Sequence, residues 1–341
     1  MKINFKKILS HWHFALVCAV FIFLLTIFYN TFFTPNYYSS SDKIQFDIKR
    51  GEAFSSIGER LYNLGVIPSK TNFRIAAFIY GAEKRVRAAR FQIPNGLSYL
   101  DLLDLFIYGN CDFERVIDID PGQTIKWLAF KLQRDIFVDS SQFVNTAFNS
   151  EFIKSIGLNL NSLEGYLFAN EYIVYERSSP EELLKIFSDA LNNFFVDSLK
   201  RRADEIGFSI HEILTLASII KGETNVIEEM PVISGLYHNR LRIGMRLQAD
   251  PTIQYLLPDG WRRLYYEDLQ IDSPYNTYKY AGLPPGPINN PGSNAILAAL
   301  YPEQNKYLYM VADGRGGHKF GKTLAEHNKN VRDFRRKFRK R

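Results

Sequence analysis

The sequence is poor in cysteine and has no metal-binding spacing. Its 341 residues include two cysteines, Cys18 and Cys111, and Cys18 lies in a long apolar run. We therefore expect no internal disulfide, and the two cysteines lack the close pairing of a zinc site. The histidines His238, His318 and His327 could gather in the fold, but no HExxH or similar pattern supports this. The sequence thus predicts neither a disulfide-bonded scaffold nor a metal or cofactor site.

The body of the chain also has little net charge. The formal net charge is +6, and residues 332–341 contain seven Lys or Arg and one Asp, which account for all of it. A nucleic-acid-binding protein usually carries a basic patch on its folded domain, so we expect no nucleic-acid partner. We interpret the basic tail as a solvated helix end. The alternative is attraction to anionic lipid headgroups or polymers.

One long segment contains no Asp, Glu, Lys or Arg. Residues 12–33 would span roughly 33 Å as a helix, enough for the apolar core of a bilayer. A cleavable signal peptide is the alternative, but its apolar part would be shorter and would end in small residues, whereas this run ends in two phenylalanines. Three lysines precede the run, which predicts that residues 1–11 are cytoplasmic and that the rest of the chain lies outside. Residues 34–42 are expected to be a linker.

A plan of strand, glycine turn and amphipathic helix occurs three times after this linker. We predict that the copies form a small α+β module over residues 43–140, followed by a larger mixed α/β domain over residues 141–331. The first copies resemble LysM-type glycan-binding units, and the alternative is a spacer. The copies are Phe46–Leu61, Phe91–Leu105 and Val116–Leu132, with turns at Gly51, Gly96 and Gly122.

A buried helix is predicted in the middle of the larger domain. Residues 213–220 are apolar on almost every face, and Ser209 and Glu212 have the spacing of a capping box in front of them. Glu223 follows directly after this apolar run. A carboxyl at the end of a buried element is partly desolvated, which raises its pKa and suits a general acid. The alternative is an exposed glutamate at the end of an ordinary buried helix.

Polar residues follow the candidate acid on a second helix, with Pro231 in its first turn and Gly244 at its end. The cluster is His238, Asn239, Arg240, Gln248 and Asp250. A carboxylate at Glu164 lies in an aromatic-rich segment further upstream, with a surface glutamate as the alternative. Residues 273–292 contain five prolines and form a long structured loop, which is usually functional. Its tyrosines offer apolar faces and hydroxyls that suit sugar rings, and the alternative is a loop that covers the core.

Several of these stretches resemble the YceG-like endolytic murein transglycosylases. The matching stretches are ASIIKGET at Ala217–Thr224, NRLRIGMRLQADP at Asn239–Pro251, LEGYLFANEY at Leu163–Tyr172, SPYNTYKYAGLPPGPINNPG at Ser273–Gly292, and YLYMVADGRGGHKF with TLAEHN near the C-terminus. The resemblance covers roughly residues 45 to 331. It implies a catalytic Glu223, with substrate-binding roles for Glu164, Asn239, Arg240, Gln248, Asp250, Tyr275 and Asn276.

The resemblance also implies a function and a place in the cell. It implies a single-pass protein of the bacterial inner membrane, with a periplasmic domain that cuts peptidoglycan strands beside bifunctional peptidoglycan synthases. A lytic transglycosylase needs one carboxyl group, because the C6 hydroxyl of the muramic acid attacks the anomeric carbon and leaves a 1,6-anhydro end. A hydrolytic muramidase would need a second carboxylate. The remaining alternative is a non-catalytic glycan-binding scaffold.

The match departs from the family at Lys221, Gly222 and Ala249, where an acid, a lysine, and a serine or threonine are usual. An ammonium close to the carboxyl of Glu223 would lower its pKa and weaken the acid. Glu228 and Glu229 follow in a polar link and are expected to be exposed.

Overall fold

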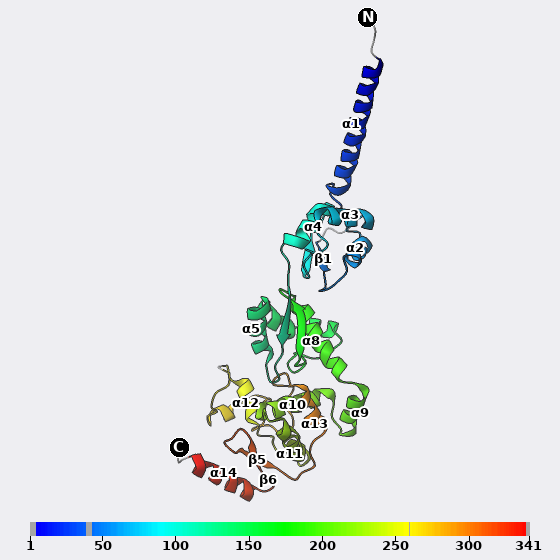
Figure 1. Ribbon diagram of the computed structural model, residues 1–341. Coiled ribbons are helices and arrows are strands. Elements are labelled where there is room, and N and C mark those ends of the chain that lie inside the picture. Colours follow the sequence, from blue (N-terminus) through cyan, green and yellow to red (C-terminus); the bar gives the residue numbers. More distant parts are fainter. Residues whose placement is uncertain (1–4, 39–42, 259, 339–341) are drawn as a thin grey trace. The chain divides into compact units, whose positions relative to one another are not determined.

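The computed structural model describes residues 5–38, 43–258 and 260–338 (Figure 1). The chain divides into two compact units, Met1–Arg115 and Val116–Arg341. We call them unit 1 and unit 2. The first residues of the expected cytoplasmic segment, the second half of the expected linker and the last three residues of the basic tail lie outside the described residues.

Unit 1 begins with one long apolar helix, α1 (Phe5–Phe32). Its segment Trp12–Phe32 has a mean hydropathy of 2.2, and apart from Phe32 at its end no residue of the segment is buried against the rest of the protein. A helix of this length and composition is long enough to cross a bilayer. The predicted N-terminal apolar helix is therefore confirmed, whereas its orientation stays a prediction.

The rest of unit 1 packs helices against a two-stranded antiparallel sheet. Phe46 lies opposite Phe91 in this sheet, and both rings contact Phe106 in a fully buried core. The first two strand–turn–helix copies are present, and their turns at Gly51 and Gly96 have the positive φ that favours glycine. A helix between the copies, α3, was not predicted. The elements are β1 (Ile44–Asp47), α2 (Phe54–Asn63), α3 (Lys70–Tyr80), β2 (Arg90–Ile93) and α4 (Tyr99–Tyr108).

The described part of the expected linker, residues 34–38, lies against unit 1. The backbone N–H of Asn36 donates to the carbonyl of Leu97 at 2.9 Å. Tyr38 is buried, and its hydroxyl donates to the carbonyl of Ile93 at 2.8 Å. These bonds hold the chain after α1 onto the surface of the unit.

Unit 2 contains the third strand–turn–helix copy. Its strand β3 (Glu114–Asp118) pairs with β4 (Glu171–Tyr175), and the turn at Gly122 leads to α5 (Ile125–Ile136). The division between the units thus falls before the boundary expected near residue 140. The helices that follow are α6 (Ser140–Ala147), α7 (Ser150–Ser155), α8 (Pro180–Phe194) and α9 (Asp197–Glu205).

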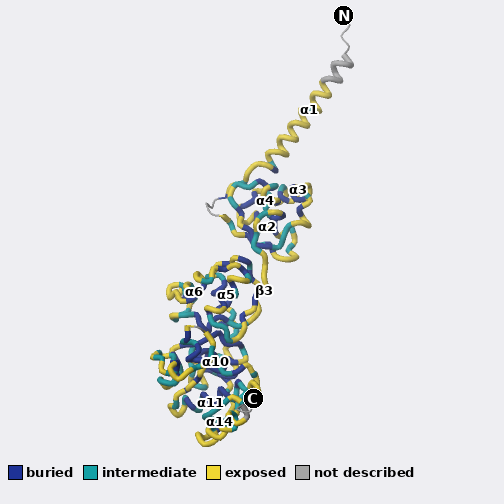
Figure 2. Tube along the Cα trace, turned by 90° about the vertical axis from the view of Figure 1, so that its left-hand side faces the viewer, coloured by how far each residue is buried: buried dark blue, intermediate teal, exposed yellow. Residues whose placement is uncertain are grey.

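Helix α10 (Ile210–Glu223) is the central element of unit 2. All its residues from Ile213 to Ile220 are buried, as the all-round apolar sequence predicts (Figure 2). Ser209 and Glu212 form the predicted capping box at its start. The helix packs against α11 (Met230–Arg242), α12 (Asp250–Leu256) and α13 (Ser293–Leu300).

The end of the chain forms a hairpin and a helix. Strand β5 (Tyr309–Ala312) pairs antiparallel with β6 (His318–Gly321), as the DGRGG turn predicts, and α14 (Leu324–Phe338) follows. Short helical turns occur at η1 (Ile227–Glu229) and η2 (Asp268–Gln270). The described residues combine many helices with sheets of two strands each, so the predicted mixed α+β class is confirmed. The LysM-like nature of unit 1 stays a prediction.

Candidate active site

Glu223 is the last residue of α10 and lies against α11. The backbone leaves the helical conformation at Thr224, so the Glu223 side chain projects from the end of a buried helix. The hydroxyl of Tyr237, which is fully buried on α11, donates a hydrogen bond of 2.6 Å to Oε1 of Glu223. The other oxygen, Oε2, makes no hydrogen bond to a described residue. Because Glu223 keeps partial solvent access, Oε2 is the oxygen that can exchange a proton with a ligand.

The surroundings of Glu223 place its pKa in the neutral range. Burial raises the pKa to about 7, and the negative charge of Asp250 adds to this rise. The hydrogen bond from Tyr237 and the positive charge of Arg240 act in the opposite direction, because both stabilise the carboxylate. Near neutral pH the group therefore populates both protonation states. Such a carboxyl can give a proton and take one back.

Lys221 is not among the groups that shift the pKa of Glu223. Its ammonium group donates to the side chain of Asn225, and its stem lies beside Gly122. Residues two apart on a helix point to different sides, so Lys221 and Glu223 do not face each other. Among the described residues, the charged groups that shift the pKa of Glu223 are Asp250 and Arg240.

Gly222 allows close packing beside the candidate acid. A Cβ added at Gly222 would lie 2.5 Å from Cβ of Pro251, so any larger residue would force α10 and the start of α12 apart. This contact brings Asp250, the first residue of α12, beside the end of α10. Glycine at this position therefore has a packing reason in this chain.

Arg240 supports the site from inside the protein. Its side chain is buried, and its guanidinium group donates to the carbonyls of Leu308 at 2.7 Å and Leu247 at 2.5 Å. These bonds tie α11 to the segment before β5 and to the loop before α12. The donors of Arg240 are thus engaged with backbone, while its charge acts on Glu223.

The side chains of Gln248 and Asp250 are exposed, and the charge of Asp250 acts on Glu223. Gln248 has a φ of 47°, an unusual conformation for a residue other than glycine, and its N–H donates to the carbonyl of Thr277. Asp250 accepts a hydrogen bond of 2.5 Å from the hydroxyl of Tyr278. Asp250 is the first residue of α12, and the cap position belongs to Ala249.

The proline-rich loop is held from within by Asn276. This residue is fully buried, and its amide donates to the carbonyls of Leu269 and Ile271. The neighbouring Tyr275 is half-buried, with its ring centroid 5.2 Å from that of Tyr255. Asn276 therefore shapes the loop, and Tyr275 retains part of its surface for contact.

Glu164 is buried at the start of helix α5. Both its oxygens accept the backbone N–H of Ile125, at 3.1 and 3.3 Å. Burial raises the pKa of Glu164 to about 8, although this hydrogen bond lowers it. Burial raises the pKa of Tyr255 and of Tyr275, and the charge of Glu164 adds to this rise, so Glu164 lies near these two tyrosines.

Asn290 joins three loops around Glu164, and the sequence analysis did not single it out. Its Oδ1 accepts the N–H groups of Gly165 and Leu167, at 2.9 and 3.0 Å. Its Nδ2 donates to the carbonyl of Gln123 at 3.0 Å, and Asn290 is fully buried. No local pattern could reveal this, because the partners lie more than 120 residues away in the chain.

Asn239 lies on α11, and its side-chain amide hydrogen-bonds to the segment before β5. Its Nδ2 donates to the carbonyls of Asn305 at 3.0 Å and Tyr307 at 3.1 Å. These bonds attach the segment before β5 to α11. The structure therefore places Asn239 among supporting contacts, in contrast to the exposed Gln248 and Asp250.

Two residues near the acid were missed or misjudged from sequence. Tyr237 was not named, although a buried tyrosine usually needs a partner for its hydroxyl, and this signal points to a nearby acceptor. The expectation that Glu229 is exposed is wrong, whereas Glu228 is exposed. Glu229 accepts from the N–H of His318 at 2.8 Å and contacts its ring Nδ1 at 2.9 Å, which fixes the β5–β6 turn.

The three histidines do not come together. His238 contacts the carbonyl of Ala299, His318 contacts Glu229, and the ring of His327 lies against Tyr309. Among the described residues, no group of three or more His, Cys, Asp or Glu side chains could hold a metal ion.

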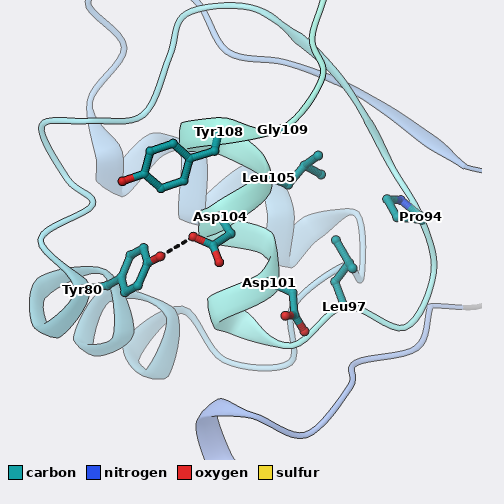
Figure 3. A pocket seen from close by; sticks show the side chains of 8 residues that line it. All are labelled: Tyr80, Pro94, Leu97, Asp101, Asp104, Leu105, Tyr108 and Gly109. Carbon is teal, nitrogen blue, oxygen red and sulfur yellow. Dashed lines mark hydrogen bonds between the residues drawn. The ribbon is translucent and has the colours of Figure 1, made fainter.

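A separate hollow of about 640 Å³ lies in unit 1 (Figure 3). Tyr80 and Tyr108 stand on one side of it, and the hydroxyl of Tyr80 donates to Asp104. Tyr108 is exposed, and the guanidinium group of Arg85 lies 5.3 Å from the centroid of its ring. The hollow coincides with the second strand–turn–helix copy. It is lined by Tyr80, Pro94, Leu97, Asp101, Asp104, Leu105, Tyr108 and Gly109.

Glu223 and its surroundings form a candidate acid–base site, and comparison with known proteins gives the family. The profile of the YceG-like family matches residues 46–333, so the chain belongs to this family. An endolytic murein transglycosylase of Bacillus subtilis is 32% identical over 308 residues, covering 85% of this chain and 84% of that protein.

More distant relatives agree with this assignment. An endolytic murein transglycosylase of Streptococcus pneumoniae is 26% identical, and the match covers 86% of this chain and 58% of that longer protein. A yceG-like protein of Listeria monocytogenes has a solved structure with a TM-score of 0.59 and 30% identity. That match covers 85% of this chain and 99% of the Listeria chain.

Proposed function

We propose that this protein is a membrane-anchored endolytic murein transglycosylase. It cleaves the bond between MurNAc and GlcNAc within peptidoglycan strands and leaves 1,6-anhydroMurNAc ends. The observation that carries the proposal is the carboxyl of Glu223, held by Tyr237 at the end of a buried helix with a pKa near 7. The relatives that match most of this chain and are named for this activity support it.

The proposed reaction uses one carboxyl group twice. Protonated Glu223 gives its proton from Oε2 to the glycosidic oxygen as the bond to the anomeric carbon breaks. The C6 hydroxyl oxygen of the same muramic acid then bonds to the anomeric carbon, and its proton returns to the Glu223 carboxylate. Tyr237 stabilises the carboxylate between the steps, and no water is consumed.

The substrate contacts divide into direct and supporting ones. Gln248, Asp250 and Tyr275 keep exposed or half-exposed surface, and we assign them to sugar contact. Arg240, Asn276 and Asn239 donate side-chain hydrogen bonds to backbone carbonyls, and we assign them the role of positioning the segments that surround the site. We assign Glu164 a supporting role near Tyr255 and Tyr275.

A hydrolytic muramidase is the second candidate, and one observation favours it. The charge of Asp250 acts directly on Glu223, so a second carboxylate lies near the acid. Glu164 is the weaker choice for that role, because with a pKa of about 8 it is largely protonated at neutral pH. Digestion of purified sacculi by the full chain in detergent, followed by mass spectrometry of the muropeptides, tests the proposal. Anhydro ends support it, and reducing ends contradict it.

Glycan binding by unit 1 is a separate part of the proposal. The hollow in Figure 3 combines two tyrosine rings with two aspartates, which suits stacking on a sugar and bonding to its hydroxyls. Tyr108→Ala should reduce sedimentation of the full chain with insoluble sacculi. Tyr62→Ala, at an exposed tyrosine outside the hollow, is the control. Equal sedimentation of both variants and wild type would make unit 1 a spacer, the alternative to glycan binding.

The proposed anchor places unit 2 in the periplasm, beside nascent strands made by bifunctional peptidoglycan synthases, whose length the enzyme would limit. Lys2, Lys6 and Lys7, which precede the apolar run of α1, support this orientation. Alkaline phosphatase fused after Arg341 should be active, since it requires an oxidising compartment. An inactive fusion that is stably made would reverse the orientation.

A further inference from the structure

Helix α3 of unit 1 carries an apolar ridge on its exposed side. Ile75, Phe78 and Ile79 have the i, i+3, i+4 spacing of one helix face, and 44%, 77% and 58% of their surfaces are exposed. The other side of α3 is buried in the core through Phe73 and Ala77. An exposed cluster of large apolar side chains on one face marks an interaction site. We call these three residues the α3 ridge.

The α3 ridge belongs to the part of unit 1 where the apolar helix α1 ends. Phe32, the last residue of α1, is buried in the core of the unit, with its ring 6.2 Å from that of Tyr99. Helix α1 contacts α3 directly. The backbone bond between Asn36 and Leu97 then holds the following chain. Over the described residues, no free chain separates α1 from the helices and sheet of unit 1. A bilayer that contains α1 must therefore lie close to α3.

The segment around the α3 ridge is basic. Residues 69–88 contain five Lys or Arg and one Glu. Arg74 lies beside the ridge on α3 and Lys84 follows shortly after the helix, and both are exposed, whereas the guanidinium group of Arg85 donates to the hydroxyl of Tyr108. An amphipathic helix with apolar residues on one side and cations beside them is typical of helices that lie in the membrane interface. Lys and Arg side chains near an anionic membrane surface are attracted to it.

We propose that the α3 ridge docks on the surface of the membrane that α1 crosses, with Arg74 and Lys84 at anionic phospholipid headgroups. This rests on the membrane anchoring proposed above but not on the catalytic assignment. The docking fixes unit 1 on the bilayer and so restricts how far from the membrane a bound glycan can be held. A second copy of the chain on the ridge is the competing occupant.

Photocrosslinking of the full chain in nanodiscs that contain phosphatidylglycerol tests the docking. p-Benzoylphenylalanine replaces Phe78 in one variant, and Phe21, exposed on α1, in a second variant. A third variant carries it in place of Phe113, which is also exposed and lies near the end of unit 1. Mass spectrometry then identifies lipid adducts. We expect adducts from positions 21 and 78 and none from position 113.

Other results would overturn the proposal. Adducts at position 21 without adducts at position 78, or crosslinks from position 78 to a second chain, would show that the ridge does not face lipid. If position 21 also gave no lipid adduct, the proposed membrane anchoring would be wrong, and the docking would be wrong with it. Replacing both Ile75 and Ile79 by serine should reduce the lipid adduct at position 78 several-fold. An unchanged yield would contradict a role for the ridge.

Discussion

The hydroxyl of Tyr237 lies 2.6 Å from Oε1 of Glu223 and donates a hydrogen bond to it. Burial raises the pKa of Tyr237 well above its ordinary value, so the hydroxyl keeps the proton that it donates to Oε1. The bond reserves Oε1 for Tyr237 and directs the exchangeable proton to Oε2. It also offsets part of the rise that burial causes in the pKa of Glu223.

Tyr237→Phe should therefore change the pH dependence of the enzyme. Since Glu223 must be protonated to act as an acid, kcat/KM should fall as pH rises above about 7 in the wild type. Without the donor, the pKa of Glu223 rises and this fall moves to higher pH. A hydrogen bond to a charged group contributes about 1.5–3 kcal/mol, so the plateau rate should fall roughly 10- to 100-fold.

The matched control is Tyr172→Phe, which removes a buried tyrosine hydroxyl that donates to the carbonyl of Phe168. This variant should keep the wild-type pH profile. A loss in Tyr237→Phe that is equal at every pH would assign Tyr237 to packing alone.

Glu223→Gln tests the proposed acid itself. Glutamine keeps the shape and accepts the bond from Tyr237 but cannot give or take a proton. Loss of general acid–base catalysis typically costs about 10² to 10⁴ in rate, and here both steps fail together. Glu228→Gln, an exposed change five residues away, should retain full activity in the same muropeptide assay. An active Glu223→Gln variant would require another proton donor.

The elements of this site that depend on local sequence were predictable. The capping box at Ser209 and the apolar run of α10 specify a buried helix that ends at Glu223, because both signals lie within a few turns. The β5–β6 hairpin follows in the same way from its glycine-rich turn.

The elements that depend on long-range packing were not predictable. Tyr237 reaches Glu223 only because α11 packs back on α10. Glu229 is half-buried because the distant β5–β6 turn covers it, although its neighbours in sequence are polar. The third strand–turn–helix copy shares its local pattern with the first two, but its strand pairs with β4, which the pattern does not encode.

Glu164 should make the stability of unit 2 depend on pH. Burial raises its pKa from 4.5 to about 8, so between these values the folded protein holds a proton that the unfolded chain has lost. Folding then takes up a proton, and stability falls as pH rises from about 5 to 8. Glu164→Gln should flatten this fall in thermal unfolding of the full chain, leaving the smaller part due to Glu223. An identical slope in the variant would contradict the assignment.

Asn290→Ala should destabilise unit 2. The change leaves the buried N–H groups of Gly165 and Leu167 without an acceptor, and each such group costs about 1–3 kcal/mol. Denaturant unfolding should therefore show a loss of about 2–6 kcal/mol for the two groups together. Asn192→Ala, at an exposed position on α8, should change stability little. A small effect at Asn290 would mean that the three loops do not depend on it.

The most direct test of the one-carboxyl mechanism is digestion of purified glycan strands in water enriched in oxygen-18. The C6 hydroxyl of the muramic acid is the proposed nucleophile, so the new ends should be 1,6-anhydroMurNAc without the heavy isotope. Mass spectrometry of the released fragments gives the answer in one spectrum. Reducing ends that carry oxygen-18 would instead show that water attacks, and Asp250 would then be the first candidate for the second carboxylate.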